Sequence, residues 1–117
     1  MPTQLSDSTR AIEQLRAFLR GEGYCAGIQR HYPPIARRFL TYLEDQNESA
    51  ETAQPSDLEG FLQKEDRAYR KRHSRAPGDI RAWRIEHAAP ARLLLRLVHG
   101  HWPRELPPTS RRQDFHR

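Results

Sequence analysis

The stretch "LRAFLRGEGYCAGIQRHYPPIARRFLTYLE", Leu15 to Glu44, joins two apolar runs through a glycine-rich corner. Before the corner, apolar residues recur every three or four positions, which is the spacing of one face of an α-helix. Gly21 and Gly23 favour an end to that helix, because glycine readily adopts the left-handed conformation found after helix C-termini. We therefore predict a first helix over residues 8–22, with Ser8 as its N-cap, and a helix–turn–helix corner after it.

The second apolar stripe runs from Ile28 to Leu43, but Pro33 and Pro34 fall inside it. A proline inside a helix removes a hydrogen bond and clashes with the preceding turn, at a cost of about 3 kcal/mol. The sequence therefore predicts a short helical turn over residues 26–31, a kink, and a new helix from Pro34 to about Asp45.

Two further helical regions follow a polar loop. "PSDLEGFLQKEDRAYRKRH" predicts a third helix, in which Ser56 and Glu59 have the spacing of a capping box. The segment "RAPGD" ends this helix. Asp79 is placed to cap a fourth helical region, Pro90 is expected to kink it, and Gly100 is expected to end it.

No segment alternates apolar and polar residues as a half-buried strand does. The fold class that we predict is all-α, a small four-helix bundle with kinked second and fourth helices. The length of 117 residues suits one domain. We assign residues 1–103 to the helical domain and residues 104–117 to a linker or tail, because the latter have no apolar periodicity.

Composition indicates a cytoplasmic protein. No apolar run approaches the roughly 20 residues that cross a bilayer, so no membrane partner is expected. The polar stretch from Met1 to Thr9 lacks the apolar core of a secretion signal. Cys25 is the only cysteine, which fits a reducing compartment, and a lone cysteine is most often a small buried apolar side chain.

Charge is segregated along the chain, whose formal net charge is +5. From Glu44 to Asp66 there are eight acidic residues and one basic residue, whereas from Arg67 to Arg96 there are nine basic and two acidic residues. Such asymmetry is typical of a protein with one side that faces a polyanion.

The basic run "RAYRKRHSR", Arg67 to Arg75, is the strongest candidate for a functional surface. Arginine and lysine pair with phosphates, arginine can also contact guanine edges, and Tyr69 can pack on a sugar or base. Most charge runs are merely solvated helix faces, so a helical protein–protein interaction domain remains an alternative. The predicted DNA-binding residues are Arg67, Arg70, Lys71, Arg72, Arg75, Arg37, Arg38, Arg81 and Arg84.

The order of these motifs resembles the N-terminal SAM-like, core-binding domain of the tyrosine recombinase (phage-integrase) family, in a transposase-like branch. The corner residues that carry the resemblance are Gly23, Tyr24, Cys25, Ile28, Tyr32, Phe39 and Leu40. "DLEGFL", Asp57 to Leu62, is similar to the next family signature, and "LLLRLVHGHWP", Leu93 to Pro103, resembles the closing helix.

The resemblance implies a SAM-like bundle that forms part of a clamp around duplex DNA. In this family a C-terminal catalytic domain supplies Arg, Lys, His and a nucleophilic Tyr, and that set is not found in this chain. We therefore expect a non-catalytic module of a site-specific recombinase, integrase or transposase. The implied partners are duplex DNA, a C-terminal catalytic domain and other recombinase protomers.

Catalytic, metal and cofactor motifs are not visible in the sequence. Tyr24 and Tyr32 occupy core-facing positions, and no cluster of cations is composed around any tyrosine, as phosphoryl transfer requires. His99 and His101 form an H-x-H, but a structural zinc site usually needs four ligands. We expect no catalytic residue, no metal site and no cofactor in this chain.

Overall fold

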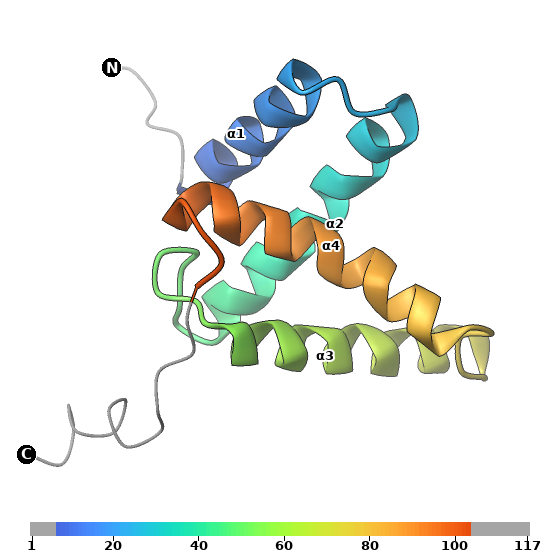
Figure 1. The fold of residues 1–117 in the computed structure, drawn as a ribbon. Helices are drawn as coiled ribbons and strands as arrows, with labels where there is room; N and C mark the ends of the chain where they lie inside the picture. The colour runs from blue at the N-terminus through green and yellow to red at the C-terminus, as the bar shows by residue number, and fades with distance from the viewer. Residues whose placement is uncertain (1–6, 104–117) are drawn as a thin grey trace, which may run out of the picture.

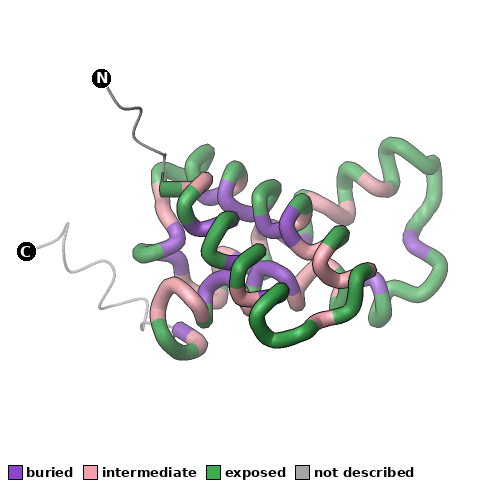
Figure 2. Tube along the Cα trace, turned by 90° about the horizontal axis from the view of Figure 1, so that it is seen from above, coloured by how far each residue is buried: buried purple, intermediate pink, exposed green. Residues whose placement is uncertain are grey.

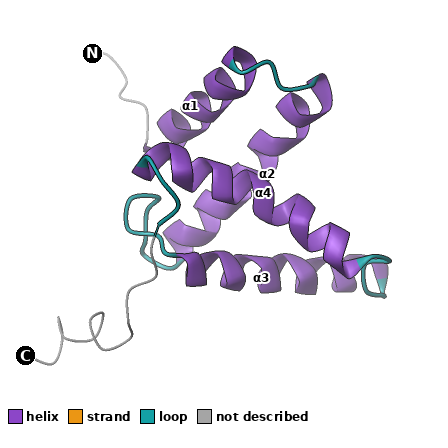
Figure 3. Cartoon of the chain, in the orientation of Figure 1, coloured by secondary structure: helices purple, strands orange, loops and turns teal. Residues whose placement is uncertain are grey.

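The computed structural model describes residues 7–103, which form four α-helices and no strand (Figures 1 and 3). The helices are α1 (Asp7–Gly21), α2 (Ala26–Asp45), α3 (Pro55–His73) and α4 (Ile80–His99). The all-α, four-helix prediction is confirmed. The predicted tail at 104–117 lies outside the described residues.

Helices α2 and α4 are both central, because each packs against the other three helices, whereas α1 and α3 do not contact each other. The start of α1 and the end of α4 lie on the same side of the molecule, and the connection between α3 and α4 lies on the opposite side (Figure 1). The side-chain amide of Gln14 on α1 donates to the backbone carbonyl of Leu97 on α4 and so joins these two helices.

The core is built from the apolar stripes of all four helices. Phe39 of α2 and Phe61 of α3 meet edge to face, with ring centroids 5.3 Å apart, a favourable arrangement for aromatic pairs. Within residues 7–103, no polar or charged residue is classed as buried. The largest fully buried aliphatic side chains are Ile12, Leu15, Leu19, Leu43, Leu94 and Leu95.

The corner between α1 and α2 forms as predicted. Gly23 has a φ of 73°, its N–H donates to the Arg20 carbonyl, and the Tyr24 N–H donates to the Leu19 carbonyl. These bonds satisfy carbonyls that the end of α1 would otherwise leave unpaired. Cys25, expected to be buried, is exposed, because it is the N-cap of α2 on this corner rather than part of a core stripe.

Pro33 and Pro34 do not divide α2, so the predicted break between two helical pieces is wrong. The prolines leave two carbonyls one turn back without their helical donors. However, Pro33 is itself buried, and Ala36 and Phe39 bury the same face of the helix just beyond it. Packing of an apolar face usually contributes more to helix stability than local propensity does, and here it keeps α2 continuous.

Helix α4 likewise continues through Pro90, although it changes direction near its middle in Figure 1. Asp79 caps its start as predicted, since the Oδ1 atom accepts the Ala82 N–H at 3.1 Å. Gly100 ends it with a φ of 83°, also as predicted.

Two caps predicted from the sequence are wrong. Ser8 lies inside the first turn of α1, where its hydroxyl donates to Glu44, and is not the N-cap. At α3 the capping carboxylate is Asp57, whose Oδ2 accepts the Gln54 N–H at 2.8 Å, rather than Glu59. Pro at the first helical position fixes this earlier start.

Candidate nucleic-acid interface

Helices α3 and α4 form a hairpin whose outer end carries most of the predicted DNA-binding residues. We call residues 67–81 the hairpin tip; it contains the last turns of α3, the loop and the first residues of α4. Ser74 ends α3 in the left-handed conformation, with a φ of 59°. Pro77 is the one buried residue of the tip, and the rest of this end is largely exposed (Figure 2).

Helical geometry places the basic residues of α3 on more than one face. Arg67 and Lys71 are four residues apart and therefore lie one turn apart on the same exposed face. Arg72 is turned by about 100° from Lys71, since an α-helix has about 3.6 residues per turn. Its side chain lines a pocket between helices instead.

Three of the nine predicted residues are engaged by carboxylates. Arg38 of α2 reaches Glu65 of α3, with its Nε and Nη2 both 3.0 Å from Oε1. Arg70 pairs with Asp66 one turn back on α3, at 3.0 Å. The third residue, Arg84 of α4, pairs with Glu59 of α3 at 2.7 Å. Exposed ion pairs typically contribute between about 0 and 1 kcal/mol, so Arg70 and Arg84 are held only weakly, whereas the Glu65 partner of Arg38 is only 15% exposed.

Six predicted residues are exposed and have no ion-pair partner within residues 7–103: Arg37, Arg67, Lys71, Arg72, Arg75 and Arg81. Five of them belong to the hairpin tip, because the loop after α3 brings the start of α4 beside its end. Arg37 is the exception, since it lies on α2. The structure thus gathers most of the predicted cations at one end of the hairpin.

Most of the acidic half of the charge pattern lies at the other end of α3, although Glu65 and Asp66 lie closer to the hairpin tip. The end of α2, the loop at 46–54 and the first turns of α3 meet there, away from the hairpin tip (Figure 1). Asp57 caps the start of α3, whereas Arg70 and Lys71 are in its last turn. This order also matches the helix macrodipole, which favours anions at the N-terminus and cations at the C-terminus.

Aromatic rings hold the two helices of the hairpin together. Tyr69 of α3 packs on His73 at a centroid distance of 4.2 Å and meets the edge of Trp83 of α4 at 6.3 Å. Trp83 is 8% exposed and stacks on His87 at 4.2 Å. Tyr69, expected to pack on a sugar or base, therefore packs first on its own helix and on α4.

A pocket of about 310 Å³ opens where α2, α3 and α4 meet. The residues that line it are Arg38, Glu65, Ala68, Tyr69, Arg72, Trp83 and His87. Sequence reasoning named Arg38 and Arg72 but missed Glu65 and His87. The spacing of Trp83 and His87, four residues apart on one helix face, was the available signal for His87.

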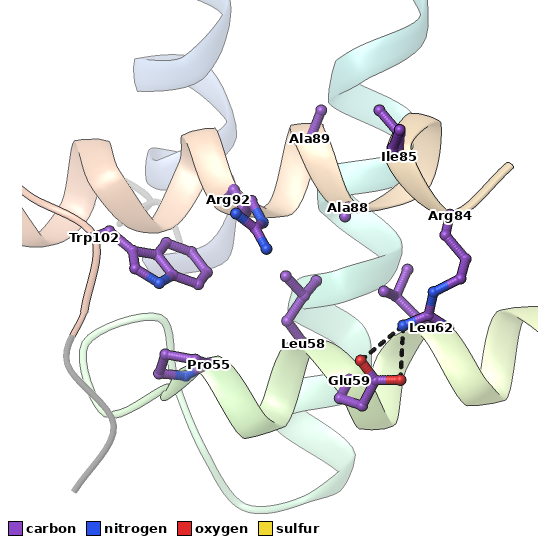
Figure 4. Close-up of a pocket in the computed structure, with 10 residues that line it drawn as sticks. All are labelled: Pro55, Leu58, Glu59, Leu62, Arg84, Ile85, Ala88, Ala89, Arg92 and Trp102. Atoms are coloured by element: carbon purple, nitrogen blue, oxygen red, sulfur yellow. Dashed lines mark hydrogen bonds and ion pairs between the residues drawn. The ribbon is translucent and has the colours of Figure 1, made fainter. Parts of the chain in front are cut away.

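A second hollow, of about 490 Å³, separates the first half of α3 from the middle of α4 (Figure 4). At one end Arg84 donates from Nη2 to both carboxylate oxygens of Glu59, at 2.7 Å each. At the other end Arg92 lies 5.0 Å from the centre of the Trp102 ring. Apolar residues, among them Leu58 and Leu62, line the space between (Figure 4). Arg84 is thus directed into an apolar groove rather than toward the hairpin tip.

Burial raises the pKa of the Tyr32 and Tyr42 phenols above the ordinary value of 10.0. At Tyr42 the nearby carboxylates of Asp57 and Glu48 raise the pKa further, while Arg67 lowers it. A raised pKa keeps a phenol protonated at neutral pH and makes it a poorer nucleophile.

The described part of the chain contains no three His, Cys, Asp or Glu side chains close enough to hold a metal ion. His99 instead bonds the Ala50 carbonyl through Nε2, at 2.8 Å. None of the helices within residues 7–103 combines the length and apolar character needed to cross a bilayer. The chain matches no family model, no curated protein and no solved structure.

Proposed function

We propose that this chain is a non-catalytic DNA-binding module of a site-specific tyrosine recombinase, integrase or transposase. In this proposal it grips duplex DNA mainly through phosphate contacts from the hairpin tip. The observation that carries the proposal is the gathering of Arg67, Lys71, Arg72, Arg75 and Arg81 at one exposed end, without ion-pair partners within residues 7–103.

Electrostatics also supports one orientation on DNA. Duplex DNA is densely charged, and neutralising its phosphates with Lys or Arg releases condensed counterions, which drives sequence-independent binding. The acidic end of α3 is repelled by the same phosphates. The hairpin tip therefore points toward the duplex, and the loop at 46–54 points away from it.

The resemblance of the corner at Gly23 and Tyr24 to the core-binding domains of tyrosine recombinases supports the same reading. In that family strand cleavage belongs to a separate catalytic domain, which in our proposal supplies the chemistry and much of the sequence specificity. A module of this kind needs to hold DNA in register, for which phosphate contacts suffice.

One observation favours a protein partner instead. Ile85 of α4 is 68% exposed and lies between the groove of Figure 4 and a third hollow, of about 600 Å³, which separates α4 from α2. Exposed apolar side chains beside grooves are typical of protein interaction sites. This is the alternative function, a helical protein–protein interaction domain.

A fluorescence-anisotropy titration of a labelled generic duplex, at salt concentrations between about 50 and 200 mM, distinguishes the two functions. DNA binding through the five unpaired cations of the hairpin tip predicts a linear fall of log affinity with log salt, with a slope of up to about 4.5. Failure to bind duplex even at the lowest salt would exclude the DNA-binding function and favour the protein partner.

A further inference from the structure

We infer that the pocket between α2, α3 and α4 is a seat for one phosphate group. This inference rests on the proposed function for the source of the phosphate, which is the backbone of duplex DNA. It goes beyond that function because it assigns one phosphate to a defined set of side chains from three helices, in addition to the exposed cations of the hairpin tip.

Hydrogen-bond donors remain available on the walls of the pocket. The guanidinium of Arg38 has five N–H donors and directs Nε and Nη2 at one carboxylate oxygen of Glu65, so its other edge stays open. Arg72 has no ion-pair partner within residues 7–103. The Nδ1 atom of His87 lies 2.9 Å from the Trp83 carbonyl, which only accepts, so Nδ1 donates there and Nε2 can donate to a phosphate only when the ring is doubly protonated.

The shape of the site fits a phosphate better than a carboxylate. Arg38 comes from α2 and Arg72 from α3, so donors approach from two helices, and the His87 ring of α4 adds a third direction when it is doubly protonated. The tetrahedral oxygens of a phosphate can accept from several directions, whereas a planar carboxylate is matched by a single arginine fork. The rings of Tyr69 and Trp83 form part of the wall.

Charge favours an anion as well. The charged residues that line the pocket are two arginines, Arg38 and Arg72, and one carboxylate, that of Glu65. The Glu65 side chain is only 15% exposed. Glu65 holds Arg38 across the gap between α2 and α3, so it acts as a positioning residue for the cation. The pocket volume, about 310 Å³, is at the small end of the range for ligand sites, as expected for a group that remains attached to a polymer.

A pair of charge-neutral double variants tests the inference. R38Q/E65Q removes the pocket's ion pair without leaving an unpaired carboxylate. D45N/K64Q removes the Lys64–Asp45 pair, which joins the same two helices at 3.9 Å but does not line the pocket. In duplex titrations at several salt concentrations, R38Q/E65Q should lower the salt slope by about 0.9, the value for one lost phosphate contact. D45N/K64Q should leave it unchanged.

A second measurement does not depend on DNA or on the stability of a variant. Inorganic phosphate added to the wild-type chain should shift the NMR signal of the Arg38 Nε–H, and acetate at equal ionic strength should not. If the two double variants have equal slopes and phosphate does not shift the Arg38 signal, the phosphate seat is overturned. In that case the proposed function still stands as long as the wild-type chain binds duplex DNA. A phosphate shift without duplex binding supports the pocket with free phosphate as its source and rejects the proposed function. An equal shift with acetate would overturn the assignment to phosphate.

Discussion

Gly60 of α3 lies against the hydroxyl of Tyr42 on α2 so closely that a Cβ atom at position 60 would overlap the phenol oxygen. The ring carbon Cζ of Tyr42 would be 3.2 Å from that Cβ, which is also tight. Tyr42 is braced in turn by Phe61, with ring centroids 6.0 Å apart. The missing side chain at Gly60 therefore sets how closely α2 and α3 approach.

We expect Gly60→Ala to lower the free energy of unfolding, although alanine is the better helix former by about 1 kcal/mol. Overpacking of this kind typically costs about 1 to 3 kcal/mol. In a Tyr42→Phe background the overlap with the hydroxyl is absent, so the same substitution should cost at least about 1 kcal/mol less. Urea unfolding of the four chains of this double-mutant cycle measures the difference, and equal costs in both backgrounds would contradict the contact.

Pro34 offers a test of the continuous second helix. It is exposed, so replacing it removes little packing, whereas alanine restores the N–H that α2 lacks at this position. Pro34→Ala should therefore stabilise the protein by about 1 to 3 kcal/mol, and raise the Tm by several degrees. Pro33→Ala is the control and should gain less, because Pro33 is buried and its packing is lost. If α2 were broken here, Pro34→Ala would not stabilise it.

Alkaline pH should destabilise the fold through two partly buried phenols, those of Tyr32 and Tyr42. Burial raises the pKa of Tyr32 and Tyr42 above 10.0, so folding favours their protonated form. This contribution is fully present below the unfolded pKa of about 10 and is lost as pH rises through the folded pKa. Urea unfolding at pH 8 and at about pH 11 should therefore show a larger loss for wild type than for Tyr32→Phe/Tyr42→Phe. Equal losses would contradict the raised pKa values.

The sequence predicted the fold where local signals decide it. The third helix was placed within the stretch 55–73 and its R-A-P-G-D stop was correct, because such signals act on their immediate neighbours, although the cap was assigned to Ser56 rather than to Gln54. The continuity of α2 could not be predicted, since it depends on burial of Pro33 against distant residues. Cys25 was misjudged for a similar reason: composition alone does not distinguish an exposed helix cap from a core position.

The sequence predicted which basic residues form the candidate site, but not how their side chains are arranged in space. The run Arg67 to Arg75 identified the hairpin tip directly. The pairing of Arg38 with Glu65 joins residues 27 positions apart, and only the packing of α2 on α3 brings them together. Which cations remain unpaired, and which line a pocket, therefore follows from the tertiary structure.

The central claim is that the hairpin tip, rather than net positive charge, grips DNA. R67Q/K71Q/R75Q removes three unpaired cations from the tip. R20Q/R30Q/R96Q removes three exposed cations from α1, α2 and the last turn of α4, and lowers the net charge equally. Thermal melts of both variants control for folding, which solvated substitutions change by only about 0.5 kcal/mol.

The most direct measurement is the salt dependence of duplex affinity for these two triple variants beside wild type. Each lost phosphate contact lowers the slope by about 0.9, so the tip variant should lose up to about 2.7 units and bind all duplexes more weakly. The control variant should keep the wild-type slope. Equal slopes for the two triple variants, with both folded, would contradict the account, because affinity would then depend on total charge and not on the hairpin tip.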